Sequence, residues 1–255
     1  MNLVKEIRNR DVYQISFWGT FLSYFIIPVI LLIPFIFLIV TKTDYDFLTV
    51  MSIFIDQQNS SPDIMNKILI FSVIIEVVSR VIMIVLIVSF LKNYLIGDAK
   101  KFSKNLPINI VIIVGGFIAI LLVNLLITLF YQLIGIKGDS ANEEAVREML
   151  NSNMRPFMVI VVVILAPILE ELMFRKILIG FLIETLHLHK VVAFSISAFV
   201  FAFVHVIGDF QEIIFIIPYL ALSIVITLSY AFSKNNIYVP IGVHFLNNLL
   251  AIFAV

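Results

Sequence analysis

Two adjacent glutamates and an arginine lie inside an apolar stretch that is long enough to cross a lipid bilayer. The stretch runs from about Phe157 to Ile183 and carries Glu170, Glu171 and Arg175 near its middle, and about 20 apolar residues suffice to span the hydrocarbon core. Charges at this depth are costly, so they normally face the protein interior and mark a functional site. At about 100° per residue, Glu171 and Arg175 share a helix face and can pair, whereas Glu170 points about 100° away. Glu170 therefore needs a partner from another helix.

Two histidines and an asparagine lie at similar depth in later apolar stretches. His205 lies near the end of the stretch at 191–207, and His244 and Asn248 are one helical turn apart in the last stretch. A single histidine in a membrane helix is usually a satisfied interior residue. Two histidines, an unpaired acid and an amide on three helices instead indicate one shared site.

Such a set supports hydrolysis by either of two routes. In the first, Glu170 acts as general base toward a water molecule, and His205 either positions that water or relays its proton. His244 and Asn248 then donate hydrogen bonds to the developing oxyanion. In the second, Glu170, His205 and His244 bind zinc, because one carboxylate and two histidines are a common catalytic zinc set. The residue types alone leave both routes open.

A proline precedes the glutamates. Pro167 lacks a backbone N–H and frees a carbonyl about one turn earlier in the helix. A kink beside an intramembrane acid suits a water-containing cavity.

The composition predicts an all-α polytopic membrane bundle. Hydrophobic residues make up 62% of the chain and charged residues 13%, against about 45–50% and about 25% in soluble domains. Long apolar runs without strict alternation favour helices over a membrane barrel. The formal net charge of zero predicts no nucleic-acid partner. The absence of cysteine excludes disulfides and thiolate sites, and no cleavable signal peptide is expected.

The apolar stretches predict about seven transmembrane helices, with kinks in the catalytic ones. Their approximate bounds are 15–40, 67–96, 108–134, 157–183, 191–207, 213–232 and 237–255. The apolar segment at 47–55 is too short to cross, so we expect it to be interfacial or re-entrant. We expect the first span to kink and the sixth to be interrupted at their prolines, Pro28, Pro34 and Pro218. We expect a basic loop after the second span, with Lys92, Lys100, Lys101 and Lys104.

The chain divides into two expected regions. Residues 1–155 would form an N-terminal membrane region of three spans plus the interfacial segment, and residues 156–255 a catalytic core of four spans. Glu76 and Arg80 are spaced by four in the second span, which is typical of a structural ion pair. Ser140 and Glu143 resemble a capping box and predict a short helix through about Leu150.

The distribution of basic residues orients the predicted spans. With a cytoplasmic N-terminus, the inner segments carry nine lysines and arginines and the outer segments carry five, in the direction of the positive-inside rule. The inner residues are Lys5, Arg8, Arg10, Lys92, Lys100, Lys101, Lys104, Lys190 and Lys234. The C-terminus would then lie outside.

Three motifs in order resemble the CAAX protease and bacteriocin-processing (CPBP, or Abi) family of intramembrane endopeptidases. They are Glu170-Glu171-x-x-x-Arg175, Phe201-x-x-x-His205 and His244-x-x-x-Asn248, and the segment from Asn236 to His244 also looks like that family. The resemblance covers about Pro156 to Leu250. It implies cleavage of a peptide bond in a membrane-associated peptide or protein.

The resemblance also implies a role for each motif residue. Glu170 and His205 would activate the water, and His244 and Asn248 would stabilise the oxyanion. Glu171 and Arg175 would form a supporting pair. An archaeal member implies a glutamate mechanism without metal, so no cofactor is expected and zinc remains the alternative. His187, His189 and Asp209 match no motif and are interpreted as loop residues.

Two other classes of function remain open: a non-catalytic immunity or regulatory scaffold, and a small transporter, since intramembrane acids and broken helices also occur in transporters. The expected partners are the lipid bilayer and a peptide or membrane-protein substrate, and the expected location is a bacterial cytoplasmic membrane.

Overall fold

The protein is described from a computed structural model that covers residues 3–42, 46–50, 62–207 and 210–253. Within these residues the chain is helical and contains no strand, as predicted. The α-helices are α1 (Leu3–Lys42), α3 (Pro62–Lys104), α4 (Leu106–Ile134), α5 (Ala141–Leu150), α6 (Arg155–Ile160), α7 (Ala166–Glu171), α8 (Ile179–Glu184), α9 (Lys190–Val204), α10 (Ile216–Phe232) and α11 (Tyr238–Ala251). Two π-helical stretches, η2 (Val161–Leu165) and η3 (Leu172–Leu178), join α6, α7 and α8 into one broken helix, and the 3₁₀ helix η4 (Phe210–Phe215) precedes α10.

These helices confirm the membrane bundle. Five segments of the described chain are long and apolar enough to cross a bilayer, and two shorter apolar helices, Lys190–Val204 and Tyr238–Ile252, accompany them. Large apolar side chains are exposed along α1 and α4, such as Phe37 at 69% and Leu133 at 86%. An apolar surface of this extent is stable against lipid rather than water.

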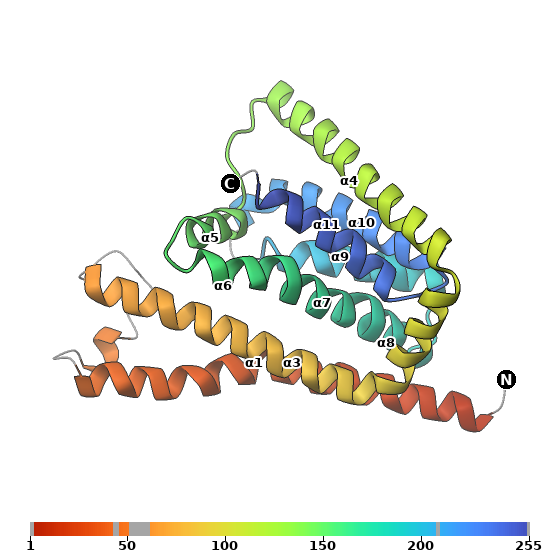
Figure 1. The fold of residues 1–255 in the computed structure, drawn as a ribbon, viewed down its shortest axis with the longest axis horizontal. Coiled ribbons are helices and arrows are strands. Elements are labelled where there is room, and N and C mark those ends of the chain that lie inside the picture. Colours follow the sequence, from red (N-terminus) through yellow and green to blue (C-terminus); the bar gives the residue numbers. More distant parts are fainter. Residues whose placement is uncertain (1–2, 43–45, 51–61, 208–209, 254–255) are drawn as a thin grey trace.

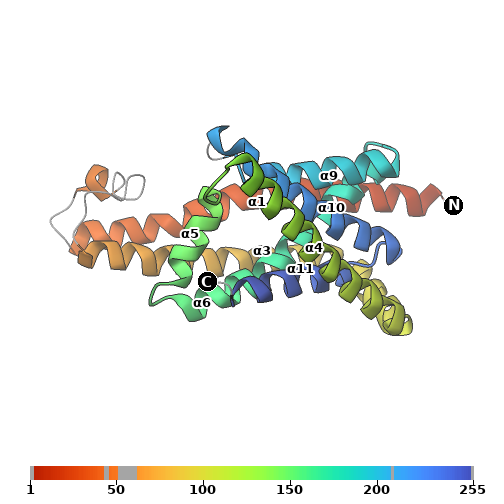
Figure 2. The same cartoon turned by 90° about the horizontal axis from the view of Figure 1, so that it is seen from above.

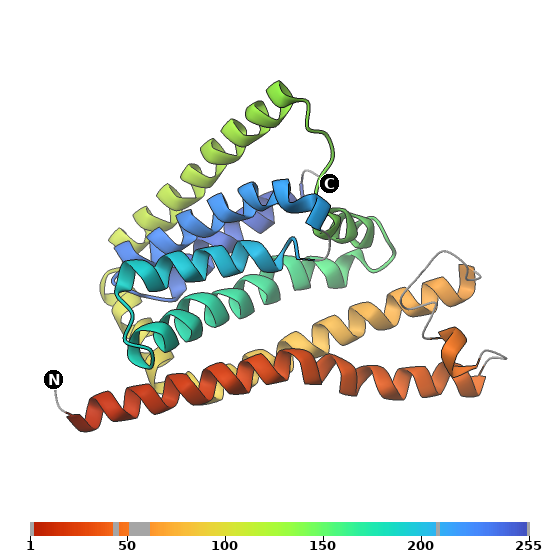
Figure 3. The same cartoon turned by 180° about the vertical axis from the view of Figure 1, so that it is seen from behind.

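The helices stack in layers (Figures 1 and 3). The pair α1 and α3 forms one face, the broken helix α6–α8 and α9 follow, and α10 and α11 come next. The outermost helix, α4, crosses α10 and α11 obliquely (Figure 2). Its Gly116 permits this contact, because a Cβ there would lie 3.0 Å from the Val243 side chain of α11.

Successive spans run in opposite directions (Figure 1). The start of α1 and the α3–α4, α8–α9 and α10–α11 links lie at one end, called here the N-terminal end. The α4–α5 link, α5 and the end of α11 lie at the opposite end, called here the α5 end. This alternation agrees with the predicted order of spans.

Two local expectations change, and the kinks expected at Pro28 and Pro34 stay a prediction. The lysines expected in a loop lie in α3, which continues to Lys104, and Asn105 alone separates it from α4. Long lysine side chains can keep their ammonium groups in water while the helix continues. Pro28 and Pro34 lie inside α1, which remains one helix through both. Pro218 lies in the first turn of α10 and does not interrupt it, because the missing N–H is unused there.

The α1 helix packs closely on the broken helix. Phe17 of α1 stacks on Phe181 of α8 with ring centroids 4.2 Å apart. A Cβ at Gly180 would lie 2.3 Å from the Tyr13 ring, so only glycine admits Tyr13 at this position. The apolar cluster around Tyr13, Met83 and Leu172 then holds α1 and α3 against the helix that carries the glutamates.

Two further segments bear on the predictions. Ser140 caps α5, its hydroxyl accepting from the Glu143 amide at 3.2 Å, which confirms the capping signal and the short helix. The predicted interfacial segment is described only up to Val50, which is buried against Phe35 and Ile36 of α1; its remainder, 51–55, lies outside the described residues. The division at residue 155 stays a prediction.

Candidate functional site

Glu171 is fully buried in a tight polar cluster. Its Oε2 lies 3.0 Å from Arg175 Nε, and both side chains have no exposed surface. Its Oε1 lies 2.8 Å from His244 Nδ1. The ion pair predicted from helix spacing is therefore present, and it is extended by a histidine from α11.

Arg175 is anchored on its other sides as well. Its Nη2 donates to Ser223 Oγ of α10 at 2.8 Å, and its guanidinium carbon lies 4.5 Å from the centroid of the Phe201 ring. A guanidinium over an aromatic face gains a cation–π interaction. The Glu171–Arg175 pair thus joins the broken helix to α9, α10 and α11.

Glu170 lies in a much looser environment. Its Oε1 is 3.8 Å from Arg80 Nη1 of α3. Its Oε2 is 4.0 Å from His205 Nε2 and 3.9 Å from His244 Nε2. These separations are too long for direct hydrogen bonds, and a bridging water suits polar groups at such distances.

Hydrogen bonding determines which nitrogen of each histidine carries a proton. His205 Nδ1 lies 2.7 Å from the Phe201 carbonyl oxygen, and a carbonyl only accepts, so Nδ1 donates. The Nε2 of a neutral His205 is then an acceptor aimed at Glu170. His244 Nδ1 likewise donates to Glu171. A water molecule between Glu170 and His205 would therefore donate a hydrogen to each and keep a lone pair for attack.

Pro167 and Asn248 are linked through the π-helical stretch before the glutamates. The Ala166 amide donates to the Val161 carbonyl, five residues earlier. In this register the Val162 carbonyl would accept from residue 167, but proline has no N–H. Asn248 Nδ2 donates to the Val162 oxygen at 2.9 Å instead. The carbonyl freed by the proline is thus satisfied from α11.

A cavity of about 330 Å³ joins these groups. Its lining includes the following polar side chains: Glu76, Arg80, Asn142, Glu143, Arg147, Glu170, His205, Tyr219, His244, Asn247 and Asn248. A cavity this size holds several water molecules or part of a peptide.

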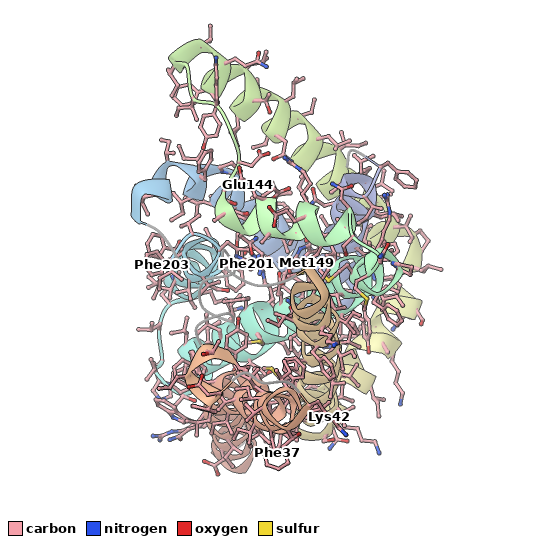
Figure 4. All side chains as sticks on the ribbon, turned by 90° about the vertical axis from the view of Figure 1, so that its left-hand side faces the viewer. Phe37, Lys42, Glu144, Met149, Phe201 and Phe203 are labelled. Atoms are coloured by element: carbon pink, nitrogen blue, oxygen red, sulfur yellow. The ribbon has the colours of Figure 1, made fainter. Side chains whose placement is uncertain are left out.

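The short helix α5 covers the cavity at the α5 end. Tyr219 of α10 hydrogen-bonds Ser140 at 2.7 Å and donates to the Glu143 carboxylate at 3.5 Å. The ring of Tyr219 stacks on His205, with centroids 4.7 Å apart. Figure 4 looks onto this end, where α5 carries Glu144 and Met149 across the bundle. A chain of contacts therefore runs from the cover helix to the site histidine.

The carboxyl of Glu143 in the cover helix has a raised pKa. Removal from water and the nearby Asp139 carboxylate raise the pKa of Glu143, and the smaller opposing effects of Arg147, Tyr219 and His205 do not cancel this. The side chain nevertheless keeps exposed surface, so solvent moderates the consequence.

Glu170, His205 and His244 are residue types that bind zinc, but their donor atoms lie farther apart than in a zinc site. Glu170, His205 and His244 aim an oxygen and two Nε2 atoms at one another, with each Nδ1 fixed by a second acceptor, as is common for zinc ligands. Zinc distances of about 2.0–2.2 Å place tetrahedral donors roughly 3.3–3.6 Å apart, and the observed separations are 3.9 and 4.0 Å. Among the described residues, no group of three histidine or acidic side chains is close enough to hold a metal ion.

The structure brings the six predicted site residues to one place: Glu170, His205, His244 and Asn248 line the cavity, and Glu171 and Arg175 lie behind them. Two further groups were missed. Arg80 was interpreted only as a partner of Glu76, to which its Nε donates at 2.7 Å, although a cation at membrane depth was a usable signal. Tyr219 gave no signal in the sequence.

The remaining polar loop residues stay apart from the site. His187 and His189 are exposed, and His189 Nδ1 accepts from the Val191 amide at the start of α9. Asp209 lies outside the described residues.

Comparison with known proteins places the second half of the chain in a protease family. A family model described as type II CAAX prenyl endopeptidase Rce1-like matches residues 152–250. YdiL of Bacillus subtilis (strain 168), described as a candidate membrane peptidase, is 30% identical over 179 residues, which cover 70% of this chain and 69% of the relative. The membrane-embedded CAAX protease MroQ of Staphylococcus aureus (strain USA300) is 29% identical over 138 residues, covering 52% and 53%. No solved structure matches the chain.

Proposed function

Because the chain belongs to the family of Rce1-like type II CAAX prenyl endopeptidases, the CPBP family, we propose that it hydrolyses peptide bonds with a water molecule activated by Glu170. Its apolar helices and its membrane peptidase relatives make it a multi-pass protein of the cell membrane. The observation that carries the proposal is the position of Glu170, loosely surrounded by two histidines and an arginine in a polar cavity.

The proposed first step begins with a water molecule between Glu170 and His205. The water oxygen attacks the carbonyl carbon of the scissile peptide bond, and one of its protons passes to the Glu170 carboxylate. General base catalysis of this kind contributes about 10²–10⁴ in rate. When the tetrahedral intermediate collapses, the C–N bond breaks and the same proton passes from Glu170 to the leaving amine.

The oxyanion formed in this step requires donors. His244 already donates from Nδ1 to Glu171, so donation from Nε2 requires the doubly protonated ring. Asn248 has a second amide hydrogen besides the one donated to the Val162 carbonyl.

We propose that this chemistry is independent of metal, with zinc as the alternative. The Arg80 guanidinium beside Glu170 supports this, because a cation repels a divalent ion at the same carboxylate. If zinc were bound, Glu170, His205 and His244 would hold it and it would supply an acidified water.

The test uses the purified protein in detergent with a library of quenched fluorescent peptides. Glu170→Gln should lower cleavage by about 10²–10⁴ and leave the melting temperature unchanged, because the amide keeps the shape of the side chain. Wild-type cleavage should persist in EDTA and in 1,10-phenanthroline. Equal cleavage by the variant and wild type would refute Glu170 as the base, and absence of cleavage by either would favour a scaffold or transporter. Loss of activity on chelation, restored by zinc, would establish the metal route.

A further inference from the structure

The two ends of the bundle carry opposite charge. The N-terminal end has ten lysines and arginines against four acids, once the buried Lys176 is included. Among the residues that the structure describes, the segments of the α5 end have five lysines and arginines against seven acids. By the positive-inside rule the N-terminal end is cytoplasmic, so the α5 end faces the other side of the membrane.

The cavity is closed toward the N-terminal end. Within one helical turn of the site in that direction, four helices each contribute a buried side chain. Arg175 follows Glu171 by four residues, Phe201 precedes His205 by four, Ser223 follows Tyr219 by four, and Val243 directly precedes His244. All four have no exposed surface, and Arg175 contacts both Phe201 and Ser223. This layer forms a floor between the site and the predicted cytoplasmic side.

The cavity is covered differently at the α5 end. There the cover is a ten-residue helix with mostly exposed side chains. It is held by the hydrogen bonds of Tyr219 to Ser140 and Glu143 and by one apolar edge, where Leu150 packs against Met158 and Val161. A single short helix with few buried side chains opens more readily than a layer of side chains with no exposed surface. A peptide can therefore reach Glu170 past α5 but not through the floor.

We propose that the cavity takes its substrate from the non-cytoplasmic face of the membrane. The substrate is then a polypeptide segment presented on that face, either an exported peptide or the outer flank of a membrane span. The substrate class in this inference rests on the proposed peptidase function. The direction from which substrate enters rests on the charge distribution and on the packing around the cavity. It excludes a C-terminal tail that stays in the cytoplasm as a substrate.

The direction is tested by labelling, which does not depend on activity. Because the chain has no cysteine, single cysteines can be introduced on the exposed residues Glu144 of α5 and Lys100 of α3. In intact cells, a membrane-impermeant maleimide should label Glu144→Cys at once and Lys100→Cys only after permeabilisation. The reverse pattern would overturn the proposal.

The substrate class is tested with sealed vesicles of both orientations and the impermeant peptide library. Right-side-out vesicles should cleave the library equally before and after permeabilisation, whereas inside-out vesicles should cleave it only after. Glu170→Gln vesicles define the background. Cleavage by intact inside-out vesicles would overturn the proposal. A lack of Glu170-dependent cleavage even in detergent would instead refute the peptidase function, and the labelling would still decide which way the cavity faces.

Discussion

Glu170 and Glu171 are neighbours in the chain but occupy opposite environments. Glu171 has no exposed surface and makes contacts of 2.8 and 3.0 Å with His244 and Arg175. Glu170 keeps 18% of its side-chain surface, and its charged neighbours lie 3.8 to 4.0 Å away. The Glu171 carboxylate is held by protein groups, whereas the Glu170 carboxylate has room for water beside it.

The difference teaches how one helix can hold both a structural and a chemical acid. Successive residues point about 100° apart, so one glutamate enters the packed interior and the next faces the cavity. His244 connects the two, with Nδ1 on Glu171 and Nε2 toward Glu170. The buried Glu171 carboxylate therefore orients the His244 ring toward Glu170.

The largest expected effect is on stability and comes from changing the buried glutamate, Glu171. Glu171→Ala leaves the Arg175 cation buried without its partner, which costs about 3–5 kcal/mol in soluble proteins. We expect a clear drop in the melting temperature of the detergent-purified protein, together with loss of activity. Glu170→Ala is the matched control and should melt close to wild type, since it removes only contacts at 3.8–4.0 Å. Equal melting of both variants would show that the Glu171 pair does not stabilise the fold.

The second prediction concerns Asn248, which has both a proposed catalytic role and a structural role. Asn248→Ala should lower turnover by about 10²–10³, as for loss of an oxyanion donor. It should also cost about 1–3 kcal/mol of stability, because the Val162 carbonyl loses its donor. Asn247→Ala, in the same cavity, should have a smaller effect on both measurements. If Asn248→Ala lowers the melting temperature but not turnover, the residue has only the structural role.

The third prediction concerns Arg80, the cation beside the more exposed glutamate, Glu170. Arg80→Gln removes the cation 3.8 Å from Glu170, and unit charges about 4 Å apart near a protein surface interact by about 4 kcal/mol. Allowing for screening by water, zinc should then inhibit cleavage at concentrations at least about tenfold lower than in wild type. Arg80→Lys should restore much of the resistance. Identical zinc titrations of the glutamine variant and wild type would contradict an electrostatic role of Arg80.

The smallest effect is expected at the cover helix. Because the pKa of Glu143 is raised in the folded protein, its protonated form favours the docked α5. Docking is therefore strongest below the ordinary glutamate pKa and weakens as the pH rises through the raised value. Amide hydrogen exchange of α5, corrected for intrinsic rates, should accelerate by up to about fivefold over this range, in keeping with exposed charges. Glu143→Gln should remove the dependence, and a persisting dependence would assign it to Asp139, Arg147 or His205.

The sequence by itself determined the fold class and the residues that meet in the site. Long apolar runs decide that the chain is a bundle of membrane helices, because a helix satisfies its own backbone N–H and C=O groups in lipid and the strict alternation of a membrane barrel is missing. Helix periodicity decides that Glu171 can reach Arg175 while Glu170 cannot. Both properties are local, so residue order is enough to read them.

Tertiary structure alone decided which groups surround Glu170. Arg80 lies 90 positions before Glu170, and its approach depends on how α3 packs against α7. The π-helical register that turns the Val162 carbonyl toward Asn248 depends on contacts between the broken helix and α11. The floor at Arg175 and Phe201 and the cover at α5 require four or more helices at once. Such contacts join residues distant in the chain, and no local pattern records which helix faces will meet.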